Sequence, residues 1–189
     1  MATGKLIIFS APSGSGKTTI VKELLKIFPQ FEFSISATSR APRGQEQNGV
    51  DYFFLSQEEF RAKVEADEFV EWEEVYNGTC YGTLKSEMER IWSKGNVIIF
   101  DVDVMGGINL KRIFRDNAHS IFIMPPSIEV LRERLIGRGT DSAETIEKRV
   151  AKAAFEISKA DEFDNIVIND ILADAVAQTK VIIEEFLAK

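Results

Sequence analysis

The residues with the clearest chemical potential lie in one glycine-rich stretch near the N-terminus, Ser10-Ala11-Pro12-Ser13-Gly14-Ser15-Gly16-Lys17-Thr18-Thr19. A loop of this composition between a strand and a helix cradles a polyphosphate with its backbone N–H groups. Its lysine, here Lys17, reaches the terminal phosphates, and the hydroxyl of Thr18 meets Mg²⁺. The pattern therefore predicts that residues 11–19 bind a nucleoside triphosphate.

The stretch departs from the usual pattern GxxxxGK(S/T) at its first position, which is Ala11. Glycine is preferred there because it tolerates positive φ angles and leaves room for the turn. The later glycines, the lysine and the threonine, which make the phosphate contacts, are all present. The alternative is a glycine-rich turn that binds nothing. We disfavour it because the stretch follows the apolar run Leu6 to Phe9 and precedes an amphipathic one.

A second candidate is the apolar run 96–101, which ends in Asp101. Ligands of doubly wound sheets bind beyond the carboxyl ends of the strands, where a carboxylate holds Mg²⁺ directly or through water. We therefore predict Asp101 and Thr18 as metal residues. Asp103 lies two residues on, and the spacing leaves open which carboxylate is nearer the metal. The alternative for Asp101 is a strand-ending residue that caps a helix.

Four arginines lie in segments rich in proline, glycine or polar residues: Arg40, Arg43, Arg138 and Arg149. Guanidinium groups bind phosphate oxygens bidentately and stay charged. A reaction between a triphosphate and a second phosphate gathers negative charge that such arginines neutralise while closure excludes water. Each arginine taken alone favours the alternative of a solvated surface residue, but the pair that brackets Ala41-Pro42 is less easily explained in that way.

The elements that must position these residues alternate between strand and helix. Apolar runs predict strands at 5–10, 96–101, 120–124 and 165–168, and helical patterns occupy 17–28, 84–94, 107–114, 141–159 and 172–187. A further helix starts at Pro125-Pro126-Ser127 and reaches Leu135. This alternation predicts a parallel α/β sheet. Residues 34–84 break it with a strand at 33–38, further short strands and a capping-box helix from Ser56, and they indicate a β-rich insertion.

Composition restricts the partners and the compartment. The chain has 189 residues, which suits one domain, and a net charge of −7, which argues against a nucleic-acid partner. Cys80 is the single cysteine, and no apolar run approaches the roughly 20 residues of a membrane span. We expect a soluble cytoplasmic protein with no membrane partner. His119, the single histidine, is expected to be structural.

Further segments, together with the phosphate loop, resemble the guanylate kinase family over nearly the whole chain. They are Ser36-Ala37-Thr38-Ser39-Arg40-Ala41-Pro42-Arg43, Asn48-Gly49-Val50-Asp51-Tyr52-Phe53-Phe54, Phe69-Val70-Glu71-Trp72, Tyr81-Gly82-Thr83, Phe100-Asp101-Val102-Asp103, Pro125-Pro126-Ser127 and Gly137-Arg138-Gly139-Thr140. The resemblance implies one α/β domain (1–189) with a P-loop NTPase-type three-layer parallel sheet core (1–33, 85–136 and 160–189). A small β-rich GMP-binding lobe (34–84) and a helical lid (about 137–159) complete it.

The resemblance also assigns roles to individual residues. Arg40, Arg43, Tyr52 and Tyr81 look like a clamp on the GMP phosphate, and Ser36, Glu71, Thr83 and Asp103 look like the guanine-recognition set. Lys17, Arg138 and Arg149 resemble the residues that stabilise the transferring phosphoryl group, and Asn169 matches a position near the ATP adenine.

Guanine chemistry agrees with this assignment. A carboxylate such as that of Glu71 accepts hydrogen bonds from the guanine N1–H and 2-amino groups, and hydroxyls such as that of Thr83 donate to O6. Adenine would leave these groups unpaired, at a cost of roughly 1–3 kcal/mol each. Spacing alone favours the alternative that Glu71 is a charged strand-edge residue among Glu68, Glu73 and Glu74.

The implied activity is Mg²⁺-dependent phosphorylation of GMP and dGMP by ATP in purine nucleotide metabolism, with small-molecule nucleotides as the partners. One rival is a scaffold domain that binds phosphopeptides; the presence of Lys17, Thr18, Arg138 and Arg149 disfavours it. Another is a kinase of the same fold for a different phosphorylated small molecule, such as a ribose bisphosphate, and the guanine set disfavours that. The sequence leaves open whether the protein is a monomer or a homo-oligomer.

Overall fold

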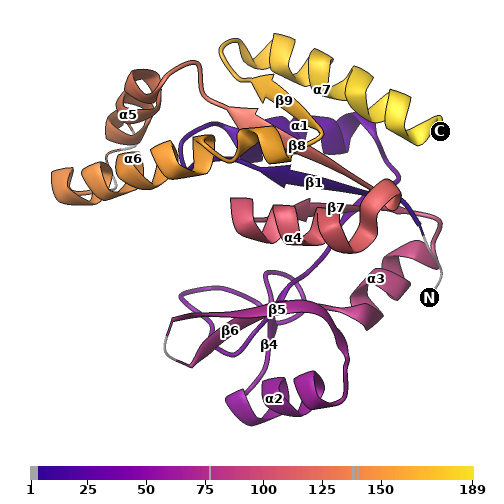
Figure 1. Cartoon of the computed structure of the whole chain (residues 1–189). Helices are drawn as coiled ribbons and strands as arrows, with labels where there is room; N and C mark the ends of the chain where they lie inside the picture. Colours follow the sequence, from indigo (N-terminus) through magenta and orange to yellow (C-terminus); the bar gives the residue numbers. More distant parts are fainter. Residues whose placement is uncertain (1–3, 77, 138, 140) are drawn as a thin grey trace. The chain divides into compact units, whose positions relative to one another are not determined.

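The structure is a computed structural model that describes residues 4–76, 78–137, 139 and 141–189 (Figure 1). The predicted catalytic residue Arg138 lies outside the described residues. The chain divides into two compact units. Among the described residues, unit 1 comprises Gly4 and Glu32–Ile98, and unit 2 comprises Lys5–Phe31 and Ile99–Lys189.

A five-stranded sheet, ordered β2-β7-β1-β8-β9, organises unit 2, and the unit boundaries fall within β2 and β7. Its strands are β1 (Leu6–Ser10), β2 (Phe31–Phe33), β7 (Val97–Asp101), β8 (Ala118–Met124) and β9 (Asn165–Ile168). β1 pairs in parallel with β8, and β8 with β9. Every residue of the run Leu6 to Phe9 is fully buried, as expected for a strand with both faces covered.

Helices cover both faces of this sheet. They are α1 (Lys17–Ile27), α4 (Val104–Phe114), α5 (Ile128–Gly137), α6 (Ala143–Ile157) and α7 (Leu172–Leu187), with short 3₁₀ turns at Arg115–Asn117 and Ala160–Glu162. Figure 1 shows α1 and α7 along one side of the sheet and α4 along the other. Val104 and Ile108 of α4 pack on Phe122 of β8. The layering confirms the predicted α/β class with a mostly parallel sheet.

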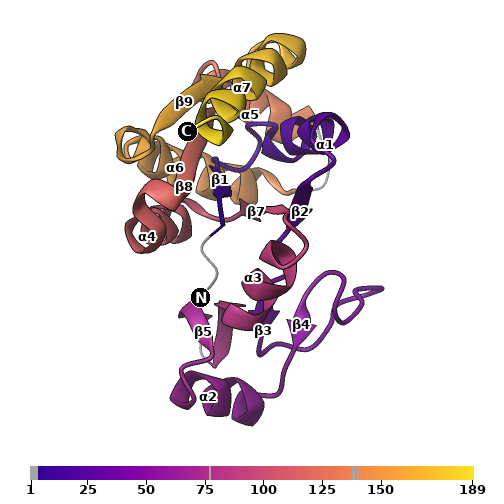
Figure 2. The ribbon, with the colours of Figure 1, turned by 90° about the vertical axis from the view of Figure 1, so that its right-hand side faces the viewer.

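Unit 1 holds a second sheet in the order β4-β3-β6-β5. Figure 2 labels β3, β4 and β5 of this sheet. Its strands are β3 (Ala37–Thr38), β4 (Phe53–Phe54), β5 (Phe69–Tyr76) and β6 (Thr79–Leu84), and its helices are α2 (Gln57–Glu65) and α3 (Lys85–Trp92). β5 and β6 are antiparallel. The predicted capping box starts α2: Glu59 N–H donates to the Ser56 hydroxyl at 3.1 Å, and Ser56 N–H donates to the Glu59 carboxylate at 2.7 Å. Phe60 then packs α2 against the sheet beside Phe69.

Two predicted elements differ clearly from the structure, and each difference has a physical reason. The single strand expected at 33–38 is two strands, because Ile35 N–H donates to the Glu87 carboxylate at 3.1 Å instead of to a strand partner. The helix expected from Gly107 begins at Val104, since the Asp103 carboxylate accepts the N–H of Gly106 at 2.8 Å and caps it. A search of the described residues found no helix with the length and apolar character of a membrane span.

Candidate active site

The glycine-rich stretch joins β1 to α1 as a compact loop. Gly14 and Gly16 have φ values of 98° and 88°, a region that disfavours side chains, and Gly16 precedes the first turn of α1. No side chain caps that turn, so the helix N-terminus is available to an anion. The hydroxyl of Ser15 donates to the carbonyl of Pro12 at 2.7 Å. Ser15 is fully buried, and its side chain therefore supports the loop from within.

Asn169 braces the same loop from the segment after β9. Its side-chain amide donates to the carbonyl of Ser15 at 2.7 Å. The backbone carbonyl of Asn169 in turn accepts a hydrogen bond from the Arg134 guanidinium at 2.9 Å. Any β-carbon at Gly16 would lie 2.2 Å from the Asn169 amide nitrogen, so this contact requires glycine. The resemblance assigns Asn169 to the adenine; the structure places its side chain against the phosphate loop.

Lys17 meets the carboxyl end of β7. Its ammonium group forms an ion pair with Asp101 and donates to the carbonyl of Val102 at 3.0 Å. The two motifs that the sequence singled out separately are therefore in direct contact. This arrangement places a cation and a carboxylate at the mouth of the loop, where the sequence predicts phosphate and metal.

A cavity of about 370 Å³ opens over the loop. It is lined by Ala11, Pro12, Ser13, Gly14, Gly16, Lys17, Thr18, Thr19, Asp101, Val102, Asp103, Arg149, Lys152 and Glu156. Every predicted phosphate-loop residue except Ser15 lines this cavity. Lys152 and Glu156 were not predicted, although their spacing from Arg149 on one helix was a usable signal.

Arg149 reaches the loop from α6. Its guanidinium donates to the Ser13 hydroxyl at 3.2 Å and pairs with Asp141 at 3.3 Å. The other oxygen of Asp141 is buried and has no hydrogen-bond partner among the described residues. Arg149 thus lies beside the loop, as its predicted role requires. No group of three or more metal-binding side chains occurs within the described parts of the chain.

In unit 1, three of the four predicted phosphate-clamp residues contact one another. Arg40 donates from Nε to the Tyr81 hydroxyl at 3.1 Å, and its guanidinium lies 4.9 Å from the centre of the Tyr52 ring. The rings of Tyr52 and Tyr81 meet edge to face with their centres 6.0 Å apart. Arg43, the fourth residue, is exposed.

Glu46 also belongs to this cluster, although the sequence patterns did not predict it. Its carboxylate accepts two hydrogen bonds from the Arg40 fork, at 2.6 and 2.8 Å, and one from Arg43 N–H at 2.7 Å. The Arg40 bonds, followed by the Arg43 bond, lower the pKa of Glu46 to about 2. The same pairing raises the pKa of Arg40. A glutamate three residues after Arg43 was the only available sequence signal.

The predicted guanine set is divided between the units. Glu71 and Thr83 face each other across β5 and β6, and the Thr83 hydroxyl donates to the Glu71 carboxylate at 2.8 Å. The Ser36 carbonyl accepts the N–H of Phe53 at 2.9 Å, which joins Ser36 to the start of β4. Asp103 belongs to unit 2, where it caps α4 and lines the phosphate-loop cavity.

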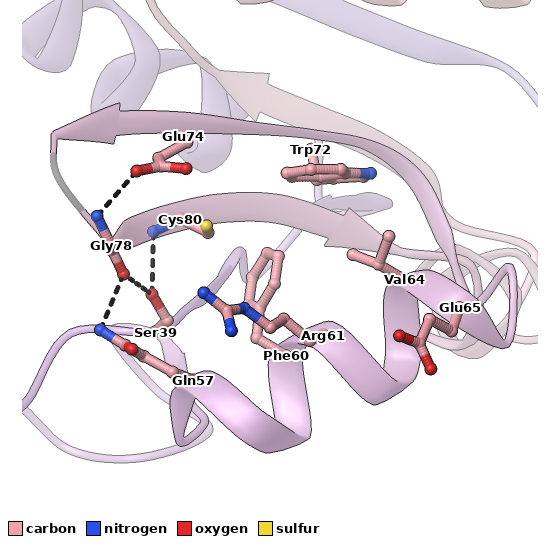
Figure 3. A pocket seen from close by; sticks show the side chains of 10 residues that line it. All are labelled: Ser39, Gln57, Phe60, Arg61, Val64, Glu65, Trp72, Glu74, Gly78 and Cys80. Atoms are coloured by element: carbon pink, nitrogen blue, oxygen red, sulfur yellow. Dashed lines mark hydrogen bonds between the residues drawn. The ribbon is translucent and has the colours of Figure 1, made fainter.

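Unit 1 has a cavity of its own, of about 160 Å³, which lies between α2 and the sheet (Figure 3). Phe60 and Arg61 of α2 and Trp72 and Cys80 of the sheet are among the residues that line it. Because successive side chains of a strand point to opposite faces, Cys80 lies on the other face of β6 from Tyr81. This cavity is therefore separate from the predicted GMP residues.

Strand β8, which lies between β1 and β9, carries His119 in a structural setting. The histidine shares a hydrogen bond of 2.7 Å with Asn165 and stacks on Phe186, with the ring centres 5.0 Å apart. Burial lowers the pKa of His119 and favours the neutral ring. These contacts agree with the structural role expected for it.

A glycine-rich loop between β1 and α1, a lysine on the carboxylate that ends β7, and a mostly parallel sheet together define an α/β protein of the phosphate-loop nucleotide-binding class. Comparison with known proteins narrows this class. Residues 3–186 match the family model described as guanylate kinase. The chain belongs to the guanylate kinase family, and it is accordingly an enzyme, a nucleotide kinase.

Individual similar proteins support the same family assignment. A guanylate kinase of Bacteroides thetaiotaomicron is 56% identical over 187 residues, which span 99% of this chain and 92% of the relative. A guanylate kinase of Porphyromonas gingivalis is 57% identical over 186 residues, which span 98% and 99%. The crystal structure of guanylate kinase from Anaplasma phagocytophilum has a TM-score of 0.72 at 30% identity and covers 98% of this chain and 87% of its own.

Proposed function

We propose that the chain transfers the γ-phosphoryl group of ATP to GMP, giving ADP and GDP, by direct in-line displacement. Membership of the guanylate kinase family supports the overall reaction. The structural observation that carries the proposal is the phosphate loop with Lys17 held on Asp101. We extend the acceptor range to dGMP.

The donor half of the reaction lies in unit 2. The loop N–H groups and Lys17 bind the β- and γ-phosphates, and Arg149 beside Ser13 neutralises charge on the transferring group. Arg138 shares this role in the proposal. Asn169 fixes the loop backbone and lies near the adenine.

A single Mg²⁺ fits the donor cavity. Thr18 and Asp101 both line it, and Mg²⁺ uses only one or two protein oxygens, with phosphates and water as its other ligands. We assign Asp101 to the metal over Asp103, because one Asp103 oxygen already caps α4. When bound, Mg²⁺ neutralises charge on the β- and γ-phosphates.

The acceptor half uses the unit 1 cluster. Arg40, Tyr52 and Tyr81, with Arg43, clamp the GMP phosphate, and Glu71 with Thr83 and Ser36 reads the guanine. Asp103 completes the guanine set. The attacking phosphate oxygen needs no strong base, so the protein acts by positioning the reactants and neutralising charge. The proposal includes residues 34–84 as the lobe that binds the acceptor and residues 137–159 as a lid. It also includes a cytoplasmic location.

A coupled ADP-release assay with GMP, dGMP, AMP and no acceptor tests the function. We expect rapid turnover with GMP and dGMP, slow turnover with AMP and almost none without acceptor. Equal rates with AMP would contradict the guanine site. ADP release that needs no acceptor would contradict phosphoryl transfer altogether.

A further inference from the structure

One wall of the phosphate-loop cavity is formed by α6. Arg149, Lys152 and Glu156 line it, at spacings of three and four residues that place them on one face of the helix. Arg149 has a role in the proposed transfer. Lys152 and Glu156 have none so far.

Glu156 is unusual among the charged residues of this helix. It is only 7% exposed, and its ion-pair partner is Lys152, with nitrogen and oxygen 3.5 Å apart. Burial raises the pKa of Glu156 and the charge of Asp103 adds to the rise, whereas Lys152 and Lys17 oppose it. A carboxylate withdrawn from water is costly unless a cation offsets it, so Glu156 holds Lys152 close.

A neighbouring pair on α6 shows that helix periodicity alone does not produce this arrangement. Glu144 and Lys148 are also four residues apart and pair at 2.7 Å, but both side chains are highly exposed, at 79% and 75%. That pair is ordinary surface chemistry. In the Lys152 pair the carboxylate is buried in the cavity wall, whereas the Lys152 side chain is 70% exposed.

The charges around the cavity leave a role for one more cation. Its lining contains three cationic side chains (Lys17, Arg149, Lys152) and three carboxylates (Asp101, Asp103, Glu156). Lys17 is engaged by Asp101, and Arg149 by Ser13 and Asp141. A bound triphosphate adds several negative charges, and Lys152 is the most exposed of the three cations.

We propose that Lys152 is a further phosphate-binding residue of the donor site and that Glu156 is the positioning residue that directs its ammonium group along the cavity wall. The proposal rests on the placement of ATP proposed above. It adds a residue to the donor site that the sequence motifs do not contain.

Steady-state kinetics of the full chain test Lys152 directly. With ATP varied at saturating GMP, Lys152→Met is expected to raise KM for ATP about tenfold, the effect of losing one charge-assisted contact. KM for GMP should stay unchanged. Lys152→Arg should restore most of the ATP affinity, because it keeps a cation there. Lys148→Met, the matched control, should behave as wild type.

Glu156→Gln tests the positioning role at nearly constant shape. It is expected to raise KM for ATP about threefold, the scale of a partly exposed ion pair. The double variant with Lys152→Met should be no worse than Lys152→Met alone, since Glu156 acts through Lys152. If the double variant raises KM for ATP by the product of the two single effects, the positioning role is overturned. If Glu156→Gln does not fold, the Lys152→Met and Lys152→Arg pair decides the proposal.

The outcomes separate this inference from the proposed function. If Lys17→Met abolishes turnover and Lys152→Met leaves KM for ATP within about twofold of wild type, the role of Lys152 is overturned and the donor site stands. If Lys17→Met retains wild-type turnover, the donor site and the inference both fall.

Discussion

At the scale of single residues, the hydrogen bond between Thr83 and Glu71 bears on the base selection that we propose. The Thr83 hydroxyl donates to the Glu71 carboxylate at 2.8 Å, which fixes that carboxylate on the sheet. We expect a carboxylate positioned in this way to accept hydrogen bonds from the two adjacent donors of guanine. Adenine has no matching pair of donors.

We therefore expect Glu71→Gln to lower kcat/KM for GMP by roughly 10- to 100-fold, the cost of losing a charged acceptor. Activity with AMP should change little, so the preference for GMP falls. The measurement is kcat/KM for both acceptors. Thr83→Ser, which keeps the hydroxyl, is the control. Unchanged discrimination in Glu71→Gln would remove Glu71 from the guanine site.

The Glu46 contacts have a consequence for the phosphate clamp. Arg40 has five N–H donors; two go to Glu46, one to Tyr81 and one to the Ala41 carbonyl. One donor remains for a phosphate, so Glu46 acts as a brace that orients the guanidinium.

For Glu46→Gln we expect KM for GMP to rise about tenfold, because a neutral amide holds the fork less firmly. kcat at saturating GMP should change much less. Asp51→Asn is the matched control, since Asp51 accepts a hydrogen bond from Gln47 in the same loop without touching Arg40. A lower KM in Glu46→Gln would instead show that Glu46 competes with the phosphate.

Much of the site was predictable from residue type and spacing, and the exceptions have a common cause. The contact between Lys17 and Asp101 follows from a motif and a strand end that share one sheet edge. No sequence motif identifies the roles of Glu46 and Lys152 or the contact that Asn169 makes with the phosphate loop. Their roles depend on side-chain directions and on contacts between distant segments, which periodicity does not encode.

At the scale of elements, α2 is held to its sheet mainly by one ring. Phe60 is almost completely buried, and its ring stacks on that of Phe69 with the centres 4.4 Å apart. Phe60→Ala is expected to lower the free energy of unfolding by about 3–5 kcal/mol. Urea denaturation measures this change. Glu58→Ala, at an exposed position of the same helix, should cost no more than about 1 kcal/mol, and equal losses would contradict the packing.

Glu32 joins the start of unit 1 to α3 and the residues after it. Its carboxylate accepts hydrogen bonds from Arg90 at 2.5 Å, Lys94 at 2.9 Å and Asn96 at 2.8 Å. Burial alone would raise the pKa of Glu32, but the bonds from Lys94, Asn96 and Arg90 outweigh it and lower the pKa to about 2.

A depressed carboxyl pKa stabilises the fold above the unfolded value of 4.5, and this contribution is lost as the pH falls toward 2. We expect the free energy of unfolding of wild type to decline through that window. Glu32→Gln should decline less steeply, and the exposed Glu185→Gln should follow wild type. Denaturant titrations at about pH 6 and about pH 3.5 measure the difference. Parallel curves for Glu32→Gln and wild type would contradict this linkage.

Element boundaries were less predictable than element types. Most strands and helices of unit 2 follow from apolar runs and helical patterns, and they lie close to where these patterns predict them. The strand expected at 33–38 is split by the contact from Ile35 to Glu87, and α4 begins early at its Asp103 cap. Both boundaries are set by single carboxylates whose partners the sequence pattern does not identify.

At the scale of the whole molecule, the predicted donor and acceptor residues belong largely to different compact units. Because each unit has its own core, we expect the two binding functions to be separable by mutation. Lys17→Ala should lower kcat by orders of magnitude with GMP affinity retained, and Arg40→Met should weaken GMP with ATP affinity retained. Calorimetric titration of each nucleotide measures both. Loss of both affinities in either variant would contradict independent sites, and circular dichroism checks the folds.

The brace between Asn169 and Ser15 joins residues 154 positions apart. During synthesis, the phosphate loop is therefore made long before Asn169. The nascent protein therefore carries the complete glycine-rich motif long before it has the contact that shapes it. We therefore expect a chain that stops before Asn169 to bind ATP more weakly than the full chain, because its phosphate loop lacks this brace.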